Sequence, residues 1–267
     1  MVLPRWVWDY IRIVMENGSY AEVRGWLRDA VAPRHSIRPS VSEATSPCPT
    51  KRDAYLRRVA KASISSSDSL TFGRLVHEVF LAPLRLSFTS LSELDSLFNK
   101  VIGDYGELGA RYKGALYEVF MKSVGLALQA REEGVPISVE PLIPGALIGF
   151  SDFIRPDLIV GFIPVEVVSS PPSGDDSSMG RKDLAVAAYA LAVEAWVGHP
   201  IDIGIVLHIT VNGGAKFVWR VIKVDDALRR TVLDLRDTVA RIIEHGDDPG
   251  VAGNCPRSCP FYGVCHG

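Results

Sequence analysis

Several stretches of the chain carry apolar residues at helical spacing, and a strand-like pattern separates them. Apolar positions three or four residues apart predict helices, which we expect over residues 1–30, 51–62, 70–81, 90–134 (two helices), 182–196 and 225–245. Residues 138–170 are rich in Ile, Val and Phe and are interrupted by Pro and Gly, which is typical of short strands. Two further strands, 201–211 and 217–224, flank Asn212-Gly213-Gly214, a strong hairpin signal. This order predicts an α/β fold, with a central mixed sheet flanked by helices and a helical N-terminal region.

The pattern also suggests three regions of different character. We expect a helical and basic N-terminal region over 1–69, a core over 70–245 and a cysteine-rich tail over 246–267, with polar loops at 63–69 and 171–180. The 267 residues are 47% hydrophobic and 22% charged, which excludes disordered and collagen-like classes. No apolar run reaches the roughly 20 residues that cross a bilayer, and Trp6, Asp9 and Arg12 interrupt the N-terminus where a signal peptide would be apolar. We therefore expect a cytoplasmic protein without membrane association.

Charge is distributed unevenly along the chain although the net charge is only −2. Residues 1–61 contain 11 Lys and Arg against 6 Asp and Glu, and the remaining residues contain 18 against 25. The basic excess is concentrated just after Cys48, at Lys51, Arg52, Arg57 and Arg58. Such a run is often only a solvated surface, but it is also the pattern that guides nucleic-acid phosphates. It predicts a local DNA contact.

The four cysteines are the most distinctive feature of the composition. Cys255, Cys259 and Cys265 lie within eleven residues of turn-forming sequence, and Cys48 is the fourth. Tight spacing lets several thiolates converge on one centre, so we predict an iron–sulfur cluster held by all four. A zinc knuckle, in which His266 could replace one ligand, and a redox disulfide are the alternatives. A cluster would connect the two ends of the chain, and its removal should destabilise the fold.

Carboxylates on an apolar hairpin predict a second site. Asp152, Asp157 and Glu166 lie among Ile- and Val-rich strands, where acidic groups are costly unless paired or metal-bound. A reversal near Gly161-Phe162 would place Asp157 opposite Glu166, whereas a reversal nearer Asp157 would favour Asp152. Either pair offers oxygen ligands to Mg²⁺ or Mn²⁺.

Two helices carry further candidate residues. Gly73 and His77 lie four residues apart on one face of the helix over 70–81, and Tyr189 lies in the apolar helix over 182–196. A lone helical histidine is usually structural, and a buried phenol usually needs a hydrogen-bond partner.

Taken in order, these motifs resemble a known nuclease family. Gly-x3-His on a helix, Asp then Glu on a hairpin and Tyr on the following helix resemble the RecB-type branch of the PD-(D/E)XK nucleases. With one cysteine before the His helix and three at the C-terminus, the chain from about residue 40 resembles the CRISPR-associated Cas-four exonuclease family. The segments Cys48–Arg58 and Arg155–Gly161 are most similar to its archaeal variant of subtype I-A.

The resemblance implies specific roles for these residues. His77, the hairpin aspartate and Glu166 would bind a catalytic Mg²⁺ or Mn²⁺, and the four cysteines would bind the cluster. The implied activity is cleavage of DNA, 5′→3′ on single strands or overhangs. It would trim new spacers during CRISPR adaptation, beside the integrase subunits Cas-one and Cas-two.

The chain also departs from the family pattern. Val168 occupies the lysine position of Glu-x-Lys, and Ala185 occupies a glutamine position. Lys182, seven residues before Tyr189 and on the same helical face, could replace the missing lysine. The gap between Cys255 and Cys259 is three residues rather than the usual two, which leaves the cluster type open between 4Fe–4S, the favoured type, and 2Fe–2S. A nuclease-fold DNA-binding or assembly subunit with weakened catalysis is therefore the alternative function, and a zinc-dependent or redox-sensing regulator is a third.

Overall fold

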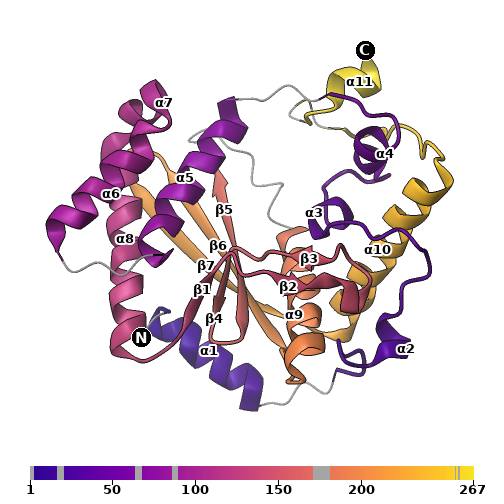
Figure 1. Ribbon diagram of the computed structural model, residues 1–267, viewed down its shortest axis with the longest axis horizontal. Coiled ribbons are helices and arrows are strands. Elements are labelled where there is room, and N and C mark those ends of the chain that lie inside the picture. The colour runs from indigo at the N-terminus through magenta and orange to yellow at the C-terminus, as the bar shows by residue number, and fades with distance from the viewer. Residues whose placement is uncertain are drawn as a thin grey trace.

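The protein is a mixed α/β structure built around one five-stranded sheet (Figure 1). The computed structural model describes residues 3–16, 21–63, 68–85, 90–170, 181–255, 257 and 259–267. The helices are α1 (Arg5–Glu16), α2 (Arg28–Val31), α3 (Val41–Ala44), α4 (Arg52–Arg58), α5 (Asp68–Arg85), α6 (Leu91–Gly103), α7 (Gly106–Arg111), α8 (Lys113–Glu132), the 3₁₀ turn η1 (Gly145–Ile148), α9 (Lys182–Val197), α10 (Asp226–His245) and α11 (Tyr262–His266). The strands are β1 (Ile137–Val139), β2 (Ile143–Pro144), β3 (Phe153–Ile154), β4 (Leu158–Val160), β5 (Ile163–Ser170), β6 (Ile203–Val211) and β7 (Ala215–Lys223).

The sheet is mixed because one of its strand pairs is parallel. Its order is β1-β4-β5-β6-β7, and β5 pairs parallel with β6 whereas the other three pairs are antiparallel. A parallel pair needs a long crossover, and α9 lies on that connection. The short pair β2 and β3 forms a separate two-stranded sheet. The expected mixed sheet flanked by helices is confirmed.

Helices cover both faces of the sheet, and each face has its own core. In Figure 1, α5, α6 and α8 lie on one side, and α9 and α10 lie on the other. Alternate residues of β5 divide between the two cores, since Val165 and Val167 pack with α5 and α8 while Val168 packs with α9. Glu166 lies two residues before Val168 on the same strand, so its side chain points to the same face of the sheet, the one covered by α9.

The hairpin predicted from the sequence is confirmed, whereas several predicted helix boundaries are wrong. The hairpin turn at Asn212-Gly213-Gly214 joins β6 to β7, and Asn212 N–H donates to the Gly214 carbonyl at 3.0 Å. The helix expected over 51–62 ends at Arg58, and 90–134 forms three helices rather than two, with a break before Gly106 at φ +51°. The polar loop expected at 171–180 lies outside the described residues.

The N-terminal helix is much shorter than the expected 1–30. It covers Arg5–Glu16, and Arg24 and Gly25 instead lie against α9, where both donate hydrogen bonds to Glu194. A Cβ on Gly25 would lie 1.9 Å from the Leu191 carbonyl oxygen, so the backbone itself packs on that helix. This tertiary contact overrides the local periodicity. No helix in the described part of the chain is long and apolar enough to cross a bilayer.

Candidate active site

The hairpin that carries the carboxylates turns at Gly161-Phe162, which is the reversal expected to place Asp157 opposite Glu166. Leu158 pairs with Val165 and Val160 with Ile163, so Asp157 and Glu166 each lie one residue beyond a paired position. Asp152 lies elsewhere, with 80% of its side chain exposed and Arg38 Nη1 at 2.9 Å from its Oδ1. The structure therefore brings Asp157, and not Asp152, to Glu166.

His77 reaches the same site from α5. Its Nε2 lies 2.9 Å from Asp157 Oδ1, and the Val167 N–H donates to Asp157 Oδ2 at 2.6 Å. The helix is held against β5 because Ser169 Oγ donates to the Gly73 carbonyl at 3.2 Å. A Cβ on Gly73 would lie only 3.3 Å from that hydroxyl oxygen, which gives the glycine of the Gly-x3-His motif a packing role.

Lys182 completes the site from the first turn of α9. Its Nζ donates to Glu166 Oε1 at 2.5 Å, while Glu166 Oε2 is buried and has no hydrogen-bond partner among the described residues. Val168 is buried on the same face, at the position where the family pattern has lysine. An ammonium group therefore reaches Glu166 from the neighbouring helix instead of from its own strand.

Burial and mutual charge shift the pKa values of this group. Burial, followed by the charge of Asp157, raises the pKa of Glu166 to about 7. Burial alone would lower the pKa of Lys182, but the charges of Glu166 and Asp157 raise it overall. Burial would also lower the pKa of His77, and its hydrogen bond with Asp157 and the charge of Asp157 raise it overall. Tyr189 is buried in α9, and its burial together with the charges of Glu166 and Asp157 holds its pKa well above 10. Strong perturbation of several adjacent groups is typical of a functional site.

The raised pKa of Glu166 predicts a pH-dependent stability. Between pH 4.5 and about 7 the folded protein retains a proton that the unfolded chain has lost, so this group stabilises the fold fully below pH 4.5. That contribution, up to about 3 kcal/mol, is lost as the pH rises through 7. Urea unfolding of metal-free protein at pH 5 and pH 8 should show this loss, and Glu166→Gln should reduce it. Equal losses in both proteins would contradict the assignment.

The donor set is suited to a divalent metal ion. His77, Asp157 and Glu166 offer one imidazole and two carboxylates, and the unpartnered Glu166 Oε2 is the kind of buried oxygen that needs a cation. Among the described residues their ligand atoms do not all lie within 4.8 Å of one another, so metal binding would draw them together.

The four cysteines lie near one another at the junction of the two chain ends. None forms a disulfide, and burial, followed by the charges of Cys255, Cys48 and Cys265, raises the pKa of the Cys259 thiol. Figure 1 shows α11 and the C-terminus beside α4, which begins four residues after Cys48. Thr50 Oγ1 also donates to the Gly250 carbonyl at 2.9 Å.

The basic residues after Cys48 do not form one exposed surface. Lys51 is 1% exposed and its Nζ donates to the Ser46 carbonyl at 2.7 Å, so the expected DNA contact of Lys51 is not supported. Arg52 binds both oxygens of Asp248 and helps to join α4 to the tail. Arg57 lies over the Phe261 ring with its guanidinium carbon 5.3 Å from the centroid, and Arg58 pairs with Glu43. Arg57 and Arg58 remain exposed.

One acidic neighbour of the site was not expected from the sequence. Glu140 has a positive φ of 46°, its N–H donates to the Asp157 carbonyl at 2.9 Å, and its charge raises the pKa of His77. A single glutamate after a short strand carries no recognisable signal, so only the fold reveals its position.

The fold and the site together define a mixed α/β protein with a buried acidic centre at the edge of its core. The family model of the CRISPR-associated exonuclease Csa1 matches residues 2–103 and 105–267, and the chain belongs to this family. The resemblance to a CRISPR-associated exonuclease family is thereby confirmed.

Two curated relatives carry the same description. The CRISPR-associated exonuclease Csa1 of Thermoproteus tenax is 28% identical over 259 residues, covering 91% of this chain and 90% of the relative. That of Saccharolobus solfataricus is 28% identical over 278 residues, covering 92% and 91%. Among solved structures, the alkaline exonuclease LHK-Exo from Laribacter hongkongensis is 14% identical with a TM-score of 0.29, covering 72% of this chain and 94% of that one.

Proposed function

We propose that the protein is a metal-dependent DNA exonuclease of CRISPR adaptation. The observation that carries the proposal is the buried Glu166, which lies beside Asp157 and receives a hydrogen bond from Lys182. The exonuclease description of the Csa1 family, to which the chain belongs, supports the same reaction class.

The residues have distinct roles in this proposal. His77, Asp157 and Glu166 would hold Mg²⁺ or Mn²⁺, which supplies activation of water and stabilisation of charge on the phosphodiester. Lys182 would orient the attacking water and offset the negative charge, as a positioning group delivered by α9. Tyr189, whose hydroxyl is kept protonated near Glu166, would donate a hydrogen bond at the site.

Degradation of end-labelled DNA tests this function directly. Purified protein with Mn²⁺ should shorten single-stranded DNA or overhangs, with 5′→3′ polarity, and EDTA should stop the reaction. Intact substrate at every Mn²⁺ and Mg²⁺ concentration would instead favour the alternative, a DNA-binding or assembly subunit with weakened catalysis. Val168 favours this alternative because it replaces the lysine of the family pattern. The contact of Lys182 with Glu166 argues against it.

We also propose that Cys48, Cys255, Cys259 and Cys265 bind an iron–sulfur cluster, of the 4Fe–4S type in preference to 2Fe–2S. The electrostatic influence of the other three thiols on Cys259 and the contacts of Thr50 and Arg52 with the tail support it. The cluster would then fasten the N-terminal region to the C-terminus, so its loss should destabilise both.

Iron content and colour provide a decisive measurement. Anaerobically purified protein should be brown and contain about four iron atoms per chain. Cys259→Ser should lose most of the visible absorption, and metal removal should lower the melting temperature. His266→Ala is the matched control, since it should keep the colour. A colourless protein containing zinc would contradict the cluster and favour the zinc alternative.

The exposed Arg57 and Arg58 are the residues of the basic run that we propose to contact DNA phosphates. Arg52 and Lys51 would stabilise the structure beneath that surface through Asp248 and the Ser46 carbonyl and would not bind DNA. The protein partners remain, in this proposal, the CRISPR integrase subunits Cas-one and Cas-two.

A further inference from the structure

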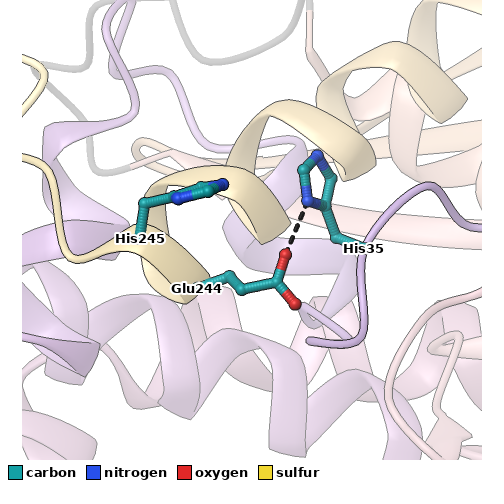
Figure 2. Close-up of side chains that lie close together, drawn as sticks. All are labelled: His35, Glu244 and His245. Atoms are coloured by element: carbon teal, nitrogen blue, oxygen red, sulfur yellow. Dashed lines mark hydrogen bonds and ion pairs between the residues drawn. The ribbon is translucent and has the colours of Figure 1, made fainter.

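A second group of metal-ligating side chains lies at the C-terminal end of α10, apart from the candidate active site. His35, Glu244 and His245 each offer one ligand atom, and these atoms all lie within 4.8 Å of one another. Among the residues that the structure describes, no other set of three His, Cys, Asp or Glu side chains meets this spacing. Figure 2 shows the three side chains gathered at the end of the helix, with His35 coming from the segment after α2.

The carboxylate in this group is already positioned by its neighbours. The backbone N–H of Ser36 donates to Glu244 Oε1 at 3.0 Å, and the Ser36 hydroxyl donates to the same oxygen. Glu244 Oε2 faces His35 Nδ1 at 2.7 Å. One oxygen is thus fixed by Ser36 and the other is directed at the imidazole, an arrangement in which outer-shell hydrogen bonds orient a ligand.

The second imidazole completes a set with the chemistry of a transition-metal site. The rings of His35 and His245 lie edge to face with their centroids 6.1 Å apart, close enough for both to approach one ion. Two imidazoles and one carboxylate are preferred by Zn²⁺ and related ions rather than by Mg²⁺ or Ca²⁺, which select oxygen ligands.

The surroundings also favour a cation. His245 is the last residue of α10, where the helix dipole places partial negative charge.

We propose that His35, Glu244 and His245 bind one zinc-class divalent ion, with solvent completing its coordination. The ion joins the segment after α2 to the end of α10. That segment also carries Arg38, which pairs with Asp152, so the ion also stabilises the position of the loop between β2 and β3. It is a structural site, separate from the ion proposed at His77 and from the cluster proposed at the cysteines.

Zinc stoichiometry tests the proposal in the full chain. Equilibrium dialysis of cluster-containing protein against Zn²⁺, with Mg²⁺ in millimolar excess, should show one more tightly bound zinc in wild type than in His245→Gln. His35→Gln should lose the same equivalent, and Ser36→Ala should bind it about 10–100-fold more weakly. His245 is exposed at a helix end, so its variant retains the fold.

His199→Gln is the matched control, because His199 is an exposed histidine that is not part of this group and whose Nδ1 contacts the Pro200 carbonyl. It should keep the full zinc content, and zinc should raise the melting temperature of wild type and of this control but not of His245→Gln. Equal zinc binding by wild type, His35→Gln and His245→Gln would overturn the proposal. Loss of the equivalent on adding Mg²⁺ alone would also overturn it, since the site would then be an oxygen-ligand site.

Discussion

Glu166→Ala is expected to abolish DNA cleavage, with a fall of about 10³-fold or more in the rate at saturating Mn²⁺. The side chain is buried on the α9 face, its Oε2 has no partner in the described structure, and its Oε1 binds Lys182. The substitution removes a metal ligand and the partner of that lysine together. Initial rates on end-labelled single-stranded DNA measure the effect.

Asp152→Asn supplies the matched control for this experiment. Asp152 belongs to the same acidic segment but is exposed and paired with Arg38, so its amide variant should keep activity within about two-fold. Asp157→Asn should instead lose activity as Glu166→Ala does, because Asp157 contacts His77. If Glu166→Ala still cuts DNA at the wild-type rate, the cleavage does not arise from this site and the proposed function fails.

Lys182→Met distinguishes a lysine that positions the attacking water from a merely structural one. We expect kcat to fall by about 10²-fold while KM for DNA changes little, because the ammonium group would act on water and not on DNA binding. Lys182→Arg should restore part of kcat, since it keeps a positive charge near Glu166. A rise in KM with unchanged kcat would contradict this role.

Glu194→Ala is expected to cause the largest loss of stability, about 3–5 kcal/mol. Glu194 and Arg229 are both fully buried, and Glu194 binds Arg229 Nη1 at 2.7 Å and Arg24 Nη1 at 2.8 Å. It also accepts hydrogen bonds from the backbone of Gly25 and Ile201. Removal of the carboxylate leaves a buried guanidinium without its main counter-charge, and urea unfolding at pH 7 measures the cost.

Glu22→Ala is the control for that measurement. Glu22 pairs with Arg230 at 3.4 Å on the surface, where both side chains are largely exposed, so its loss should cost less than about 1 kcal/mol. If Glu194→Ala lowers the free energy of unfolding by as little as Glu22→Ala does, the buried network is dispensable for stability.

The elements that the sequence predicts well are those with strong local signals. The Asn-Gly-Gly turn, the apolar helix now seen as α9 and the acidic hairpin all depend on residues close in the chain, and each forms near the expected position. Helix ends were less predictable, since Gly25 and the segment around it are placed by contact with α9 rather than by their own periodicity.

The burial of charged residues could not be predicted from the sequence pattern. A lysine in a basic run, such as Lys51, is expected at the surface, yet it is buried and donates a hydrogen bond to the Ser46 carbonyl. Arg229 and Arg236 in the amphipathic α10 are also buried. Arg229 pairs with Glu194, 35 residues away, and Arg236 donates to the Val31 carbonyl, 205 residues away, as well as to its neighbour Asp237, so local pattern shows only part of their partners.

By itself, the sequence determined the family, the order of the main helices and strands, and most of the chemistry-bearing residues, because these follow from local periodicity and motif order. Only the tertiary structure decided which of them meet. The turn at Gly161-Phe162 selects Asp157 over Asp152, and the α9 crossover brings Lys182 to Glu166. Burial then sets the charge of that group, because desolvation depends on neighbours from distant parts of the chain.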